Sequence, residues 1–244
     1  MLIDLCAYSN RWRAADPAAK GLFALSGLVS AFAAGNPLAA AGIGAIVSGM
    51  TVWGAGIPFS RFFRAALAPL CFFLLGALSL ACSVDYRTGD FIWLPGGWTP
   101  VGRLAARSCG ALASLLFFAL TTPMTDQIAL FRRLRLPETL IEIMVLCYRM
   151  LFVFSEALRD IHTAQDSRLG YASPSLALRS TGNLAAVLVV QVWQRARALH
   201  LGALSRNGDG VLRFLGPVFA NARRDMVFAF AGSALLFALL AVMP

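Results

Sequence analysis

Long apolar runs separated by short polar connections dominate the chain. Two of these runs, 21–34 and 38–54, flank the tripeptide Gly35-Asn36-Pro37, which is typical of a tight turn. Further runs cover 62–82, 104–120 and 226–243. Because a helix of about 20 apolar residues spans a bilayer, the pattern predicts a helical hairpin with short arms and three full membrane spans.

Two longer helices are predicted between 137 and 210, and similar phrases close them. Ser167-Arg168-Leu169-Gly170 ends the first run, and Ser205-Arg206-Asn207-Gly208 ends the second, 38 positions later. Ser173-Pro174 opens the second run as an N-cap and a first helical residue. Cations are favoured at helix C-termini and glycine is the usual residue just past the end. Both phrases are therefore typical of helix stops, and a pair of matched docking tips is the alternative interpretation.

The position of the stretch 140–158 relative to the membrane is ambiguous. It is apolar enough to be embedded in the bilayer, but it carries Glu142, Arg149 and Glu156. We expect it either to be embedded or to lie on the other helices. The three charges are seven residues apart, which places them on one face of a helix. Buried charges require partners, so we interpret the stripe as structural ion pairing through Arg149. A stripe that lines a transport path is the alternative.

The composition indicates a membrane protein. Hydrophobic residues make up 59% of the 244 residues and charged residues 14%, against about 25% charged residues in soluble domains. We therefore predict an all-α integral membrane protein with five to six transmembrane helices and two long amphipathic cytoplasmic helices. Residues 1–20 form a mixed, polar lead without the apolar core of a cleaved signal peptide. The first span is therefore expected to serve as the targeting signal.

The net charge of +9 predicts the orientation of the chain in the membrane. Lys and Arg accumulate on the cytoplasmic side of membrane proteins. Residues 126–224 carry 13 arginines and 7 acidic residues, so we expect this segment, and the N-terminus four spans earlier, in the cytoplasm. The basic residues are not clustered with interleaved aromatic residues, so the lipid bilayer, and not a nucleic acid, is the expected partner.

The sequence lacks the common motifs of catalysis and nucleotide binding. It contains no GxxxxGK[ST] loop, no HExxH and no GxSxG. His162 and His200 are isolated, and the five cysteines form no CxxC pair, so we interpret them as packing or surface residues. We therefore expect no catalytic residue, no metal site and no cofactor in this chain.

Four groups of residues resemble one known family. They are the lead Arg13-Ala-Ala-Asp16-Pro17-Ala-Ala-Lys20, the stretch from Thr121-Thr122-Pro123 to Pro137, the helix with Glu142, Tyr148-Arg149 and Glu156-Ala157, and the two arginine tips. Together they are similar to the transmembrane T component of energy-coupling factor (ECF) ABC transporters, in the cobalt/nickel branch. The tips in that family are usually Ala-Arg-Gly-like triplets, from which Ser167-Arg168-Leu169 and Ser205-Arg206-Asn207 depart at the flanking positions.

The resemblance implies one T-component domain over 1–244, with membrane helices at 1–122, a coupling region at 123–224 and a last span at 225–244. It implies a non-enzymatic scaffold in the cytoplasmic (inner) membrane. This scaffold joins two ABC ATPase subunits to a substrate-capturing membrane subunit that binds cobalt or nickel. The tips are then the ATPase contacts: Ser167, Arg168, Leu169, Ser205, Arg206 and Asn207. A stand-alone permease or channel for a small cation is the alternative from another class.

Overall fold

The computed structural model describes residues 2–84, 91–93, 98–205, 219 and 221–242. The described part is helical apart from two short strands, β1 (Cys82–Val84) and β2 (Phe91–Trp93), which pair antiparallel. The chain divides into two compact units. The first unit contains residues 1–130 and 217–244, and the second contains residues 131–216. The fold class predicted from the apolar runs is confirmed.

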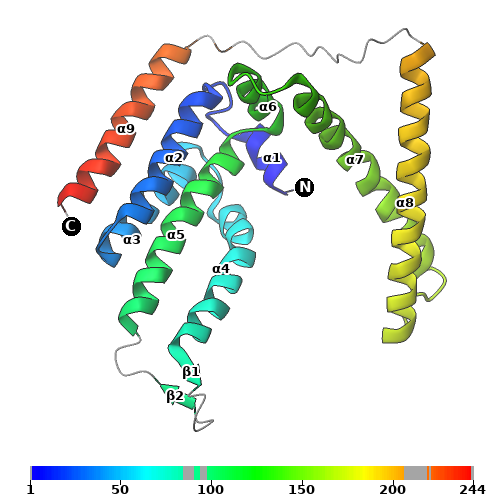
Figure 1. Ribbon diagram of the computed structural model, residues 1–244, viewed down its shortest axis with the longest axis horizontal. Helices are drawn as coiled ribbons and strands as arrows, with labels where there is room; N and C mark the ends of the chain where they lie inside the picture. Colours follow the sequence, from blue (N-terminus) through cyan, green and yellow to red (C-terminus); the bar gives the residue numbers. More distant parts are fainter. Residues whose placement is uncertain (1, 85–90, 94–97, 206–218, 220, 243–244) are drawn as a thin grey trace. The chain divides into compact units, whose positions relative to one another are not determined.

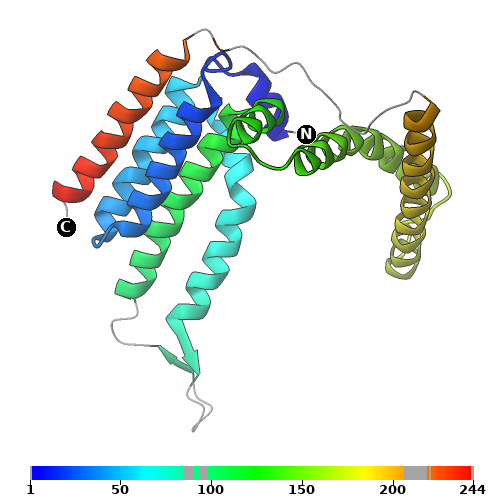
Figure 2. The ribbon, with the colours of Figure 1, turned by 45° about the horizontal axis from the view of Figure 1, so that its top comes forward.

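The first unit is a bundle of long helices. These helices lie side by side in both Figure 1 and Figure 2. They are α2 (Pro17–Ala33), α3 (Pro37–Gly49), α4 (Phe59–Ala81), α5 (Trp98–Thr121) and α9 (Ala222–Val242), and a π-helical turn, η1 (Met50–Gly54), continues α3. The first unit also contains a shorter helix, α1 (Leu2–Ser9), and most of another, α6 (Met124–Arg133), whose last three residues belong to the second unit.

Local sequence signals explain where the hairpin helices begin. Asp16 precedes α2 as its N-cap, and its Oδ1 accepts a hydrogen bond from the Ala18 N–H at 3.1 Å. Asn36 caps α3 in the same way, because its Oδ1 accepts from the Leu38 N–H at 3.1 Å. Proline at the first helical position follows each cap, where its missing N–H costs nothing. The predicted hairpin is therefore confirmed.

Small residues allow the bundle helices to approach closely. A Cβ at Gly110 of α5 would lie 2.9 Å from the Ala31 Cβ and 3.0 Å from the Ala40 backbone oxygen. A Cβ at Gly27 of α2 would lie 2.6 Å from the Ser114 Oγ of α5. Membrane helices associate through this kind of tight packing, because lipid provides no hydrophobic driving force between them.

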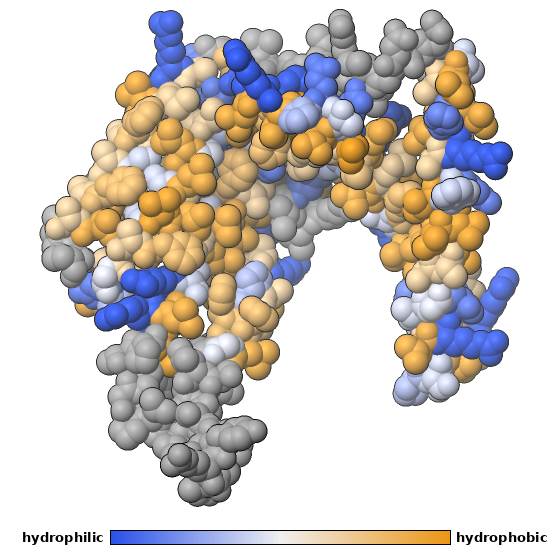
Figure 3. Space-filling model, viewed as in Figure 1, coloured by the Kyte–Doolittle hydropathy of each residue, from blue (hydrophilic) through white to orange (hydrophobic). Residues whose placement is uncertain are grey.

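Four helical segments in the described residues are long and apolar enough to cross a membrane. They are Pro37–Gly54, Val101–Thr121, Pro174–Ser205 and Ala222–Ala241. The helix α2 is apolar but shorter, as predicted for a hairpin arm, and α4 has 23 residues. Apolar side chains cover much of the face shown in Figure 3. Pro174–Ser205 was predicted as a cytoplasmic helix, and its position relative to the membrane stays a prediction.

The N-terminal lead is more structured than the sequence predicts. The polar residues before 20 contain the helix α1 and the first turn of α2. Cys6 and Ala7 of α1 are buried at 2% and 1% exposure, and Cys6 packs in the same apolar cluster as Leu116 and Leu120 of α5. The eight-residue helix α1 is too short to produce a clear periodic signal, so the sequence pattern did not predict it.

The second unit contains two long helices. They are α7 (Glu138–Asp166), with 29 residues, and α8 (Pro174–Ser205), with 32 residues. Ser173 precedes α8 and its Oγ accepts a hydrogen bond from the Leu176 N–H at 3.3 Å, so the predicted start of this helix is confirmed. All residues of α8 are described and none of them is buried. Large apolar side chains such as Trp193 (72% exposed) therefore remain at the surface of this unit.

Candidate partner-docking site

The first predicted docking tip is a closed turn at the end of α7. We call residues 167–170 the α7 tip. The Leu169 N–H donates to the Asp166 backbone oxygen at 2.9 Å, and the Gly170 N–H donates to the Gln165 backbone oxygen at 2.9 Å. This pair of bonds is the Schellman motif, which satisfies the free carbonyls at a helix C-terminus. The interpretation of this phrase as a helix stop is therefore confirmed.

The residue with left-handed backbone at the α7 tip is a leucine. Leu169 has a φ of 57°, a conformation that costs a non-glycine residue about 1 kcal/mol. The sequence pattern suggested Gly170 as the glycine that usually follows a helix end. In the structure, Gly170 is required for a different reason, which is space. A Cβ there would lie 2.7 Å from the Ser180 Oγ and 2.8 Å from the Gln165 backbone oxygen. Gly170 is therefore needed for a close approach of α7 and α8.

Side chains of both helices hold the α7 tip in place. The Ser180 Oγ of α8 donates to the Gly170 backbone oxygen at 2.8 Å. The Tyr171 hydroxyl donates to the Gln165 Oε1 at 2.8 Å. The Tyr171 ring stacks on His162, with ring centroids 4.6 Å apart and an interplanar angle of 16°. His162 is exposed at this turn, so its interpretation as a surface residue is confirmed, and its ring stacks on Tyr171.

Two side chains of the α7 tip project outward. Arg168 and Leu169 are exposed, and 72% of Leu169 is accessible. Ser167 is exposed too, but its Oγ donates back to the Ala164 backbone oxygen at 3.0 Å. A guanidinium offers a rigid fork of donors for a carboxylate or for backbone carbonyls. The α7 tip therefore presents one cation and one apolar side chain on a fixed turn.

The second predicted tip lies largely outside the described residues. Ser205 is the last residue of α8, and its Oγ donates to the Gly202 backbone oxygen at 3.0 Å. Arg206 and Asn207 fall outside the described residues. Their role as docking residues stays a prediction.

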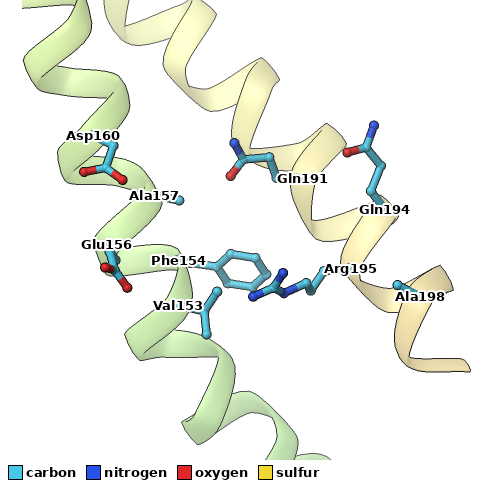
Figure 4. Close-up of a pocket in the computed structure, with 9 residues that line it drawn as sticks. All are labelled: Val153, Phe154, Glu156, Ala157, Asp160, Gln191, Gln194, Arg195 and Ala198. Carbon is cyan, nitrogen blue, oxygen red and sulfur yellow. The ribbon is translucent and has the colours of Figure 1, made fainter. Parts of the chain in front are cut away.

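The charged stripe lies along α7. Glu142 is half-buried, whereas Arg149 and Glu156 are exposed. Ion pairing through Arg149 stays a prediction. Glu156 also lines a groove of about 490 Å³ between α7 and α8, together with Asp160 and Arg195. Figure 4 shows the acidic side chains on α7 and Arg195 extending from α8. Among the described residues, no group of three or more His, Cys, Asp or Glu side chains is placed to hold a metal ion.

Sequence reasoning missed a cluster of polar residues in the first unit, of which Asp225 is half-buried and the others are buried. Lys20 is 4% exposed, and its Nζ donates to the Thr121 backbone oxygen at 3.1 Å. Asp126 is 3% exposed and, with Asp225, interacts electrostatically with the Lys20 charge. The Asp16 N–H donates to the Asp225 Oδ2 at 3.0 Å. We call Asp16, Lys20, Asp126 and Asp225 the polar cluster.

The polar cluster connects four helices of the first unit. Lys20 lies in α2, Thr121 ends α5, Asp126 lies in the first turn of α6, and Asp225 lies in the first turn of α9. Asn10 adds a further link, since its Nδ2 donates to the Ala7 oxygen at 2.8 Å and to the Thr121 oxygen at 3.1 Å. The sequence does contain the phrase Asp16-Pro17-Ala-Ala-Lys20, which could have drawn attention to Lys20. It does not show which acidic side chains lie close to Lys20 in the folded chain.

The bundle of apolar helices and the exposed helical unit define a multi-pass α-helical membrane protein. The chain belongs to the CbiQ family of cobalt transport proteins, because the family model described as "Cobalt transport protein" matches residues 9–214. The resemblance seen in the sequence is therefore confirmed. The relatives with a stated role are named as transport proteins, not as enzymes.

Three relatives illustrate the match. The cobalt transport protein CbiQ of Rhodobacter capsulatus is 36% identical over 214 residues, which are 87% of this chain and 86% of the relative. The protein MJ1089 of Methanocaldococcus jannaschii is 30% identical over 229 residues, 89% of this chain and 84% of the relative. A protein of Methanocorpusculum labreanum, described as a fused cobalt transport protein CbiMQ, is 34% identical over 107 residues, 44% of this chain and 18% of the relative.

Proposed function

We propose that this chain is the membrane scaffold of an ECF-type ABC importer. It couples ATP hydrolysis by two partner ATPase subunits to the uptake of a divalent transition-metal ion, cobalt or else nickel. A separate membrane subunit captures the metal ion. The chain itself carries out no catalysis and holds no cofactor.

One observation carries this proposal: the α7 tip is a fixed turn that presents an exposed arginine. The turn is closed by two backbone hydrogen bonds and tied to α8 through Ser180. Movement of a partner that holds Arg168 would therefore be transmitted to both long helices. An acidic groove on an ATPase subunit fits this cation, because guanidinium and carboxylate form two parallel hydrogen bonds.

The family and the sequence both support the assignment of ATP hydrolysis and metal capture to other subunits. The chain has no P-loop, so the motor is assigned to a partner. The fused CbiMQ relative extends well beyond its match to this chain, which is 18% of its length. We take the metal-capturing membrane subunit of this importer to be a separate polypeptide.

We also propose an orientation for the chain in the membrane. The positive-inside rule places the N-terminus and residues 123–224 in the cytoplasm, next to the ATPases, in a cytoplasmic (inner) membrane. We assign the membrane helices at 1–122 and the last span at 225–244 to anchoring the chain in the bilayer. Glu142, Arg149 and Glu156 are assigned to holding the helices together.

The test is cobalt uptake by a chain that lacks both arginines. We expect Arg168→Ala combined with Arg206→Ala to abolish uptake and ATPase association, while insertion into the membrane is retained. Each single substitution should have a smaller effect, because one contact remains. An exposed arginine on the same unit, Arg179→Ala, is the matched control and should leave uptake near the parent level. Full uptake by the double variant would rule out the proposal.

A stand-alone permease or channel is the competing function. The same preparation distinguishes the two functions, because a scaffold purifies with two ATPase copies and a permease purifies alone. Transport by the purified chain in vesicles without ATPase subunits would favour the permease.

A further inference from the structure

Three buried polar atoms near the end of α5 have no hydrogen-bond partner within the described part of the chain. They are the Asn10 Oδ1, the Arg13 Nη1 and the Thr122 Oγ1. Asn10 is 7% exposed and Thr122 is 1% exposed, so the surrounding solvent does not satisfy these two side chains. Buried polar groups in folded proteins nearly always have a partner, because an unpaired group carries its full desolvation cost. These three atoms therefore require one.

The three residues lie around the backbone at the end of α5. The Asn10 Nδ2 donates to the Thr121 oxygen at 3.1 Å, and Thr122 is the next residue along the chain. The Arg13 N–H donates to the Asn10 backbone oxygen at 3.3 Å. The Arg13 charge also interacts with that of Lys20, whose Nζ donates to the same Thr121 oxygen. The three atoms therefore border the polar cluster.

The surroundings of Asn10 determine the orientation of its amide. The Nδ2 lies within hydrogen-bond distance of four backbone oxygens, those of Cys6, Ala7, Leu120 and Thr121. Exchange of the amide nitrogen and oxygen would direct the Oδ1 at these four acceptors, which is unfavourable. The Asn10 Oδ1 is therefore an acceptor that still requires a donor.

The chemistry of the three atoms defines the class of ligand. The Asn10 Oδ1 only accepts hydrogen bonds, the Arg13 Nη1 only donates them, and the Thr122 hydroxyl can do either. A metal cation would match the oxygens but not the guanidinium, and an anion would match the guanidinium but not the amide oxygen. Water both donates and accepts, and a buried water molecule makes about three hydrogen bonds to polar groups of this kind.

We infer that the end of α5 is a binding site for ordered water, which bridges the Asn10 Oδ1, the Arg13 Nη1 and the Thr122 Oγ1. The bound water attaches the turn between α1 and α2 to the turn between α5 and α6. It extends the polar cluster to the N-terminal lead and gives the Arg13 guanidinium a structural role. Water-mediated hydrogen bonds of this kind are nearly as favourable as direct ones.

The sign of a stability change tests this inference. Thr122→Val keeps the shape of the side chain and removes its hydroxyl. Bound water would lose one hydrogen bond, so the midpoint of thermal unfolding of the full-length chain in nanodiscs should decrease by about 3–6 °C. Removal of an unpaired hydroxyl would instead relieve a desolvation cost and increase the midpoint. An unchanged or higher midpoint therefore overturns the inference.

Thr181→Val is the matched control. Thr181 is exposed on α8, and its Oγ1 donates to the Ala177 oxygen of the same helix at 2.8 Å. The midpoint of this variant should change by less than about 2 °C, as for other surface substitutions. A decrease as large as that of Thr122→Val would overturn the inference, because the loss would then be a general effect of replacing threonine by valine.

A structure of the parent chain in lipid, at a resolution that shows ordered water, tests the site without a variant. A water peak within about 3.2 Å of at least two of the three atoms supports the inference. The absence of a peak there overturns it. A peak with about six oxygen ligands at about 2.4 Å also overturns it, because that coordination identifies a metal ion.

Discussion

At the residue scale, charge in this protein is used in two opposite ways. Lys20 and Asp126 are buried at 4% and 3% exposure and interact with each other inside the bundle. Arg168 is exposed on the α7 tip. A buried charge is stable only with partners, whereas an exposed charge on a rigid turn remains available to another molecule. Burial therefore separates the residues that hold the fold from those that we assign to docking.

The first residue-scale prediction concerns the polar cluster. Lys20→Met removes the cation from a buried group of acids, so Asp126 loses its compensating charge. Loss of one partner of a buried pair costs about 3 kcal/mol. We expect a clear decrease in the midpoint of thermal unfolding in detergent, followed by circular dichroism.

The control for Lys20 is Arg61→Met. Arg61 is exposed in the first turn of α4, so the same loss of one positive charge should leave the midpoint nearly unchanged. An unchanged midpoint for Lys20→Met would contradict the assignment of the polar cluster as a structural link. Partial recovery on adding Asp126→Asn to Lys20→Met would support it further.

At the element scale, the helices follow from local signals, and their packing depends on small residues. Asp16 and Asn36 start the two arms of the hairpin, and Gly110 lets α5 approach that hairpin. The Arg107 side chain adds a link at the other end of α2, since its Nη2 donates to the Ala34 backbone oxygen at 2.8 Å. The hairpin is therefore attached to α5 by both tight packing and a capped carbonyl.

The element-scale prediction is a steric one. Gly110→Ala places a Cβ 3.0 Å from the Ala40 backbone oxygen, which cannot move aside as a flexible side chain can. Overpacking of this kind costs about 1–3 kcal/mol, so we expect a lower unfolding midpoint of the purified protein. Gly42→Ala is the matched control, because a Cβ at Gly42 meets nothing within 4 Å. Equal midpoints for the two variants would contradict the proposed close packing of α3 and α5.

The helices themselves could be predicted from the sequence, because apolar runs of this length produce a strong signal. The runs at 62–82 and 226–243 correspond to α4 and α9 within a few residues. The helix α1 could not be predicted, since eight residues give too few periodic positions. The partners of Lys20 could not be predicted either, because they are 106 and 205 residues away along the chain. Such contacts depend on how the helices pack, which local patterns do not encode.

The candidate site was predictable in position but not in conformation. The phrase Ser-Arg-x-Gly correctly marked the end of α7. The usual preference for glycine in left-handed backbone assigned that conformation to the wrong residue, because Leu169 adopts it and Gly170 is required by the contact with Ser180. A tertiary contact therefore overrode a local preference, and the result is an exposed leucine that the sequence alone does not distinguish from others.

At the scale of the whole molecule, the two units differ in how they bury apolar surface. The first unit has a close-packed interior, with Ile43, Val47 and Leu236 each at 0% exposure. In the second unit, large apolar side chains of α7 and α8 remain exposed, Leu178 at 78% among them. An exposed apolar surface of this kind marks interaction with protein or lipid. The second unit therefore presents apolar surface that fits contact with another protein or with lipid.

The most direct test of the scaffold function is the composition of the purified complex. The chain would be co-expressed with its ATPase and metal-capturing subunits, and the complex would be weighed by native mass spectrometry. The scaffold function predicts one copy of this chain with two ATPase subunits, and loss of both ATPase subunits from the variant that combines Arg168→Ala with Arg206→Ala. A chain that purifies without ATPase subunits, or a double variant that retains both of them, would contradict it.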